Sequence, residues 1–136
     1  MSKSLIITIF PAKDFQCSLK NIVGLLDKAG WSITDGSGKI NVWNEVTSEW
    51  EIYNGTLDDF LLNTEYNLFY AYNGSKIISV SAIGCDNSFW ISPEADIQKI
   101  TYADREYFDY NWYYINLIPA FNKGKVIVER VVFDEY

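Results

Sequence analysis

The sequence predicts an α+β fold: a single domain with a mostly antiparallel sheet and two to three helices. Most of the predicted strands follow one another through short turns, as the strands of antiparallel hairpins do, and helical segments interrupt them at only a few points. No linker-like segment divides the 136 residues, and apolar residues make up 49% of them. That is enough apolar material for one hydrophobic core, so we expect one domain over residues 1–136.

The first two predicted elements are a strand and a helix. Leu5 to Phe10 is a short apolar run rich in β-branched residues, which predicts a buried strand. From Ser18 to Ala29 the apolar residues recur at spacings of three and four, the pattern of an amphipathic helix. Ser18 or Asp14 is the predicted N-cap, and Gly30 is the predicted C-terminal stop.

Three short strands are predicted after this helix. Trp31 to Thr34 is the first, and Asp35 to Gly38 is a turn in which glycine makes a positive φ inexpensive. Ile40 to Asn44 and Glu49 to Tyr53 alternate apolar with polar residues and are the next two strands. In Glu49 to Tyr53 this alternation predicts one solvent-exposed, acidic face.

A short helix is predicted over Leu57 to Leu62. Thr56 and Asp59 stand three residues apart, at the spacing of a capping box, in which the two side chains cap the helix reciprocally.

The clearest hairpin signal is Asn73-Gly74, which lies between two largely apolar segments. The predicted strands are Tyr66 to Tyr72 and Ser75 to Ile83. A two-residue loop at Asn73-Gly74 would place Tyr70 opposite Ile77. Both faces of this hairpin are largely apolar, so we expect its strands to be central in the sheet.

The last third of the chain is less regular. Ser88 to Ser92 predicts another strand, and Val126 to Phe133 predicts the final one. The segment from Thr101 to Phe121 has helical spacing, but its dense aromatic residues around Trp112-Tyr113-Tyr114 favour a strand. We expect a helix first and then an irregular stretch that reaches Pro119.

Charge excludes two classes of partner. The chain has 18 acidic and 11 basic residues, for a net charge of −7. A nucleic-acid binder needs a basic surface that displaces counterions from phosphates, and an anionic membrane attracts basic segments. We therefore expect neither nucleic acid nor a membrane as partner.

Composition also argues against catalysis. Histidine is absent, which removes the usual triads and zinc ligands, and there is no glycine-rich phosphate loop. Cys17 and Cys85 have no cysteine or histidine grouped around them. We expect no enzyme activity, no metal and no cofactor. The apolar run at the N-terminus is too short for a signal peptide, so we expect a cytoplasmic protein with reduced cysteines.

Two segments combine acidic with aromatic side chains. The first runs from Glu45 to Glu65, within a stretch from Lys39 to Lys76 that contains six acidic residues and no basic one. The second runs from Asp104 to Trp112. Aromatic residues ringed by charge are typical of protein–protein hot spots, and the negative sign predicts a basic partner. A core-facing aromatic row beside a solvated acidic surface is the alternative. The predicted partner-binding residues are Glu49, Trp50, Glu51, Asp58, Asp59, Asp104, Glu106, Tyr107, Asp109 and Tyr110.

A small, acidic, histidine-free, aromatic-rich chain without a catalytic motif resembles the immunity proteins of bacterial polymorphic-toxin and contact-dependent inhibition systems. The resemblance is one of class and extends over the whole chain. It implies tight one-to-one binding of a cognate toxin, often a nuclease whose basic cleft an acidic inhibitor can fill. The alternative interpretation is a carbohydrate-binding or other small-ligand module that uses surface Trp and Tyr.

Overall fold

Nine strands and three helices make up the part of the chain that the computed structural model describes, residues 3–62, 66–82 and 87–136. The strands are β1 (Leu5–Pro11), β2 (Asn41–Asn44), β3 (Glu49–Ile52), β4 (Leu68–Asn73), β5 (Lys76–Ser81), β6 (Phe89–Ala95), β7 (Lys99–Tyr102), β8 (Arg105–Phe108) and β9 (Val128–Glu135). The helices are α1 (Leu19–Lys28), α2 (Leu57–Leu62) and α3 (Tyr110–Lys123).

Seven of the strands form one sheet in the order β3-β2-β4-β5-β6-β1-β9, and all neighbours in it are antiparallel. Strands β7 and β8 pair only with each other. The predicted α+β class is therefore confirmed, as is the central position of the β4–β5 hairpin.

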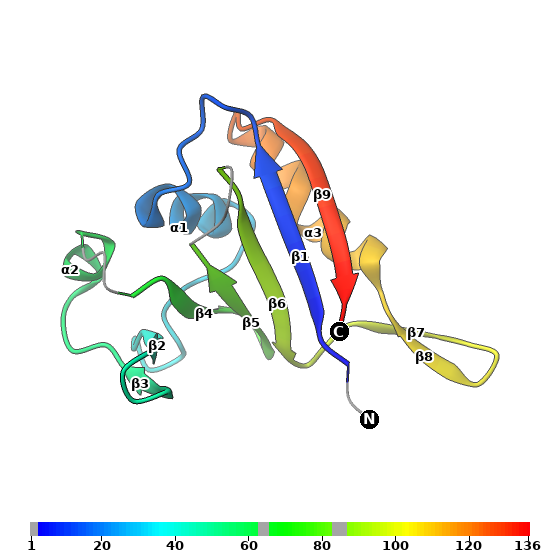
Figure 1. The fold of residues 1–136 in the computed structure, drawn as a ribbon, viewed down its shortest axis with the longest axis horizontal. Coiled ribbons are helices and arrows are strands. Elements are labelled where there is room, and N and C mark those ends of the chain that lie inside the picture. The colour runs from blue at the N-terminus through cyan, green and yellow to red at the C-terminus, as the bar shows by residue number, and fades with distance from the viewer. Residues whose placement is uncertain (1–2, 63–65, 83–86) are drawn as a thin grey trace.

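The core lies on one face of the large sheet. Its register places one apolar row across six strands: Phe133, Ile7, Ile91, Val80, Phe69 and Val42. Because side chains alternate along a strand, this face takes every second residue of each strand, and its central members are fully buried. The helices contribute buried residues to the same core, among them Leu26 of α1, Phe60 of α2 and Leu117 of α3. In Figure 1, α3 passes behind β1 and β9, on the far side of the sheet.

Local signals in the sequence fix both ends of α1 as predicted. The Ser18 side chain accepts a hydrogen bond from the backbone N–H of Asn21. At the other end Gly30 has a φ of +86°, and the backbone N–H of Trp31 donates to the Leu26 carbonyl at 2.8 Å. This is the bond of a Schellman motif, which needs a left-handed residue just beyond the helix.

The capping box of α2 is also confirmed. The Asp59 backbone N–H donates to the Thr56 hydroxyl at 3.1 Å, and the Thr56 backbone N–H donates to the Asp59 carboxylate at 3.3 Å. Two backbone donors at the start of the helix are therefore satisfied reciprocally.

The predicted register of the β4–β5 hairpin is wrong by two residues. Asn73 stays in the strand and pairs with Lys76, so Gly74-Ser75 is the loop. Gly74 has a φ of +60°, the value that a type II′ loop requires of its first residue. Tyr70 therefore lies opposite Ser79 and not Ile77. A shift of two leaves each side chain on its face of the sheet.

The predicted helix from Thr101 is also wrong. Residues 99–108 form the β7–β8 hairpin, which we call the arm, and its loop residues Ala103 and Asp104 have φ values of 51° and 62°. These left-handed residues make the tight turn. Aspartate tolerates this conformation but alanine does not favour it, so the turn could not be predicted from these residues. The helix begins only at Tyr110 and continues past Pro119.

The structure also differs from three smaller predictions. Trp31 to Thr34 is not a strand and makes only isolated bridges, Ser32 to Tyr72 and Thr34 to Ile40. Strand β6 continues past Pro93, which sits beside the irregularity where β5 and β6 shift register, a place that tolerates the missing N–H. The final strand runs from Val128 to Glu135. The predicted turn at 84–87 falls largely outside the described residues.

Within the described ranges, no helix combines the length and apolar character needed to cross a bilayer.

Substitution of two isoleucines tests whether the core stabilises the fold while the arm contributes little. Ile91 is fully buried in the apolar row, so Ile91→Ala should lower the free energy of unfolding by about 2–5 kcal/mol through the cavity it leaves. Ile100 is half exposed on β7, and Ile100→Ala should change the same quantity by no more than about 0.5 kcal/mol. Urea denaturation followed by circular dichroism measures both. An equal loss from Ile100→Ala would mean that the arm packs on the body.

Candidate functional site

Strand β3 separates the first group of predicted residues onto two faces. Trp50 lies opposite Trp43, on the side of the sheet away from the helices, while Glu51 lies opposite the core residue Val42. Glu51 is half-buried and accepts hydrogen bonds from the Asn44 amide at 3.0 Å and the Tyr66 hydroxyl at 3.1 Å. Its role is therefore structural.

The acidic residues of α2 mainly stabilise the N-terminus of that helix. Asp59 belongs to the capping box, and Asp58 is exposed in the first turn, where a negative charge favours the helix. Around them, residues 40–62 contain five acidic residues and no basic one. We call this part, β2, β3 and α2, the acidic end. It also exposes large apolar side chains, namely Val46, Ile52, Leu57 and Leu62.

The second group of predicted residues divides into two. Asp109 is the N-cap of α3 and accepts from the Trp112 backbone N–H at 3.0 Å. Tyr110 stacks on Phe133, with ring centroids 4.7 Å apart, and its hydroxyl donates to Glu135. That hydrogen bond stabilises the protonated phenol and raises the pKa of Tyr110 to about 12. Both residues hold α3 in place.

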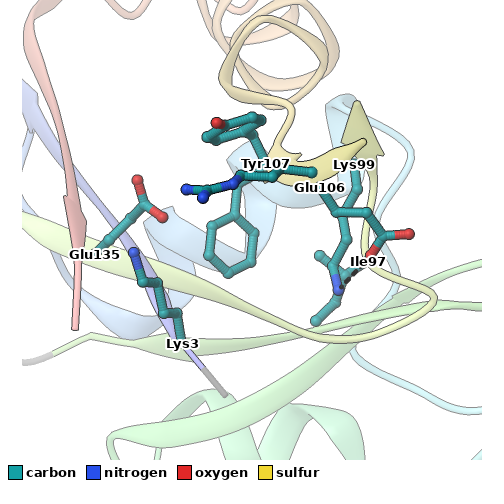
Figure 2. A pocket seen from close by; sticks show the side chains of 8 residues that line it. Lys3, Ile97, Lys99, Glu106, Tyr107 and Glu135 are labelled. Atoms are coloured by element: carbon teal, nitrogen blue, oxygen red, sulfur yellow. Dashed lines mark ion pairs between the residues drawn. The ribbon is translucent and has the colours of Figure 1, made fainter. Parts of the chain in front are cut away.

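The other members, Asp104, Glu106 and Tyr107, lie on the exposed arm. The base of the arm borders a hollow of about 450 Å³, shown in Figure 2. Its lining mixes the acids Glu106 and Glu135 with three cations, Lys3, Lys99 and Arg105. Lys99 and Glu106 form an exposed ion pair at 3.6 Å. The surface here is therefore not the purely acidic one that the sequence predicted.

The structure does not bring the two predicted groups together. The acidic end and the arm project from opposite ends of the long axis of the molecule (Figure 1). Of the ten predicted residues, Trp50 is the one that joins a larger surface.

That surface is the open face, the side of the large sheet opposite the helices. No described helix contributes to it, because the buried residues of all three belong to the core on the other side. Four rings follow one another across its β3-β2-β4 part. Trp43 meets Trp50 edge-on at 5.6 Å, Trp50 stacks on Tyr70 at 3.8 Å, and Tyr70 meets Tyr72 edge-on at 6.4 Å. We call these four residues the aromatic ladder, and all four are partly exposed.

Small polar residues form the middle of the open face. Ser79, Ser81 and Ser92 are buried, and their cross-strand neighbours on this face include Tyr70 and Trp90. The Ser79 hydroxyl lies 2.8 Å from a carboxylate oxygen of the exposed Glu94 and donates to it.

Burial, with the nearby charge of Glu94, raises the pKa of Tyr70 above its usual value, so its hydroxyl remains a hydrogen-bond donor further into the alkaline range than that of a free tyrosine. Tyr72 is tied to the adjacent strand, because its hydroxyl accepts from the Asn41 amide at 2.6 Å. The open face therefore combines fixed aromatic rings with hydroxyl groups and a carboxylate.

Sequence reasoning missed most of the open face. It assigned Tyr70 to a strand buried on both sides and did not single out Trp43, Tyr72 or Trp90. One signal could have found them. Tyr70 and Tyr72 stand two residues apart and so share a face, while the few predicted helices could cover only one side of so large a sheet.

Comparison with known proteins gives no relative: no family model matches the chain, and neither a curated protein nor a solved structure matches it. Among the described residues, no three Asp, Glu or Cys side chains come together in a way that could hold a metal ion.

Cys17 is a half-buried free thiol, and Cys85 lies outside the described residues. The Cys17 side chain packs against the core, and burial raises its pKa to about 11. The thiolate is the reactive form, so folding should protect this cysteine.

We expect Cys17 to react slowly with iodoacetamide in the folded protein. In a Cys85→Ser variant at pH 8, a pKa higher by two units makes the thiolate about 100-fold scarcer than in the urea-denatured chain. The rate should rise as the pH approaches 11. The buried neutral thiol stabilises the fold fully below its unfolded pKa near 9, and this contribution falls as the pH rises further. Mass spectrometry of quenched samples measures the rate, and equal rates in both states would contradict the assignment.

Proposed function

We propose that this protein is a non-catalytic inhibitor of the immunity type, which neutralises a basic toxin domain by binding it through the open face. One observation carries the proposal: a ladder of four Trp and Tyr rings lies partly exposed on a sheet face that no described helix covers. Trp and Tyr are the side chains most enriched at binding hot spots, because they bury much area at little entropic cost.

The ladder is preorganised for such a contact. Trp50 is held by Trp43 on one side and Tyr70 on the other, and Tyr72 is held by Asn41. Side chains that are already fixed lose little freedom on binding, so more of the contact energy appears as affinity.

Charge supports a basic partner. Glu94 places a carboxylate on the open face, and the guanidinium of Arg130 lies over the Phe10 ring at 4.0 Å. The acidic end is continuous with the ladder along the chain, because β2 and β3 supply Trp43 and Trp50 on the open face and the exposed Glu49 on the opposite face. A negative field of this kind speeds the encounter with a basic surface such as the cleft of a nuclease.

A carbohydrate-binding module is the second candidate, favoured by a specific observation. The Ser79–Glu94 pair and the protonated hydroxyl of Tyr70 lie beside aromatic rings, and sugars need polar partners and ring faces together. Titration with a panel of neutral oligosaccharides, followed by Trp fluorescence, separates the two candidates. Saturable binding of a sugar that Trp50→Ala abolishes would favour this alternative.

The ladder should dominate the affinity for the partner. We expect Trp50→Ala to weaken binding of the cognate toxin domain by about 30-fold, the loss that truncating a hot-spot ring causes. Calorimetric titration measures it. Tyr107→Ala is the matched control, because Tyr107 is 46% exposed on the arm, and it should change the affinity by less than about 3-fold. A large loss of affinity from Tyr107→Ala, with none from Trp50→Ala, would show that the contact lies on the arm.

The acidic end should govern the association rate. Glu49 and Asp58 are exposed, so the double variant Glu49→Lys, Asp58→Lys should slow association about 10-fold at low salt and much less in 0.5 M NaCl, which screens surface charges. The control reverses Asp104 and Glu106 on the arm. Stopped-flow kinetics measures the association rates of both double variants, and circular dichroism checks that each is folded. If neither reversal changes the rate, the partner is not basic.

A further inference from the structure

A hollow of about 380 Å³ lies between α1 and α2, and one of its lining residues, Ser32, bridges to Tyr72 at the end of the aromatic ladder. Its wall is mainly apolar. Val23 of α1, Ile33 after the helix, and Leu57 and Leu61 of α2 supply aliphatic side chains, and Trp31 adds its indole. The polar part of the lining comes from Lys20, Asp27, Ser32 and Thr34. A concave, mostly apolar site with few polar groups is the usual form of a small-molecule pocket.

Gly24 contributes open space to the hollow. It lies inside α1, where glycine is a poor helix former, and its φ is not left-handed, so the backbone does not require glycine there. A Cβ at this position would have no heavy atom within 4 Å. A side chain at this position would therefore begin in open space on the wall of the hollow.

Trp31 offers a hydrogen bond that the protein does not use. Its side chain is 1% exposed, and its Nε1 is the one buried side-chain nitrogen or oxygen of the described residues that has no hydrogen-bond partner. Buried donors are almost always paired in folded proteins, because an unpaired one has lost its bond to water without replacement. The hydrogen-bond acceptor is therefore missing for an indole that also lines the hollow.

We propose that the hollow binds a small, neutral, largely apolar molecule that carries one hydrogen-bond acceptor. Its apolar body would lie between Val23, Leu57 and Leu61, and its acceptor would receive the N–H of Trp31. The Nε1 atom is covered in the free protein, so binding requires a side chain to turn aside. Leu57, which is 43% exposed, is the lining side chain with the most room to do so.

A pair of probes of equal shape tests the role of the acceptor. Acetophenone carries a carbonyl group where α-methylstyrene carries a CH₂ group. In ¹H–¹⁵N spectra the indole signal of Trp31 can be assigned from its loss in Trp31→Phe. Acetophenone at millimolar concentration should move this signal downfield in a saturable way, and α-methylstyrene should bind at least about 5-fold more weakly, a typical effect of one hydrogen bond.

Two glycine variants test the place of binding. Gly24→Leu fills the hollow and improves the helix, so it should fold and weaken acetophenone binding at least about 10-fold. Gly36→Leu is the matched control, because Gly36 lies in an exposed turn outside the hollow, has no left-handed φ and also has free space for a Cβ. Its affinity should match that of the parent protein. Failure of acetophenone to bind, equal binding of the two probes, or unchanged affinity in Gly24→Leu would each overturn the proposal.

Discussion

The apolar row that crosses the sheet from Phe133 to Val42 determines most of the architecture. Each strand must turn the same alternate residues toward the helices, because a slip of one residue would move its apolar side chains to water. Once this row is buried, the directions of all the intervening residues are fixed. The aromatic ladder is therefore a consequence of the core: Tyr70 is on the open face because its neighbours Phe69 and Ala71 are both buried.

The same constraint explains why acidic residues that are close in sequence do not form one surface. Glu49 and Glu51 flank Trp50 in an edge strand, so their side chains leave the sheet on the opposite side. Glu51 then joins a hydrogen-bonded group with Asn44 and Tyr66. What remains at this end is a diffuse negative field around an aromatic surface. In the proposed function, such a field would accelerate and orient the encounter, and the rings would provide the contact.

Features set by local chemistry could be predicted from the sequence, and features set by distant pairing could not. Ser18, Gly30 and the Thr56–Asp59 box act within a few residues, so α1 and α2 were predicted with their caps. The β4–β5 register depends on which of two possible loops around Gly74 suits the whole sheet. The arm depends on left-handed φ values at Ala103 and Asp104, which neither residue type signals. Trp50 could be found from its acidic neighbours, but its partner Tyr70 comes from another strand.

The same alternation along the strands places three serines at the centre of the open face. Central strands of a sheet covered on both sides are usually continuously apolar, whereas this sheet has helices on one side and Ser79, Ser81 and Ser92 in the middle of the other. Their burial is tolerable because the hydroxyl groups are near partners, as Ser79 is to Glu94. Valine at these positions would make the face more apolar and would remove the hydrogen bond between Ser79 and Glu94. In the proposed function, the rigid rings would supply the contact area and polar groups such as Glu94 would supply specificity.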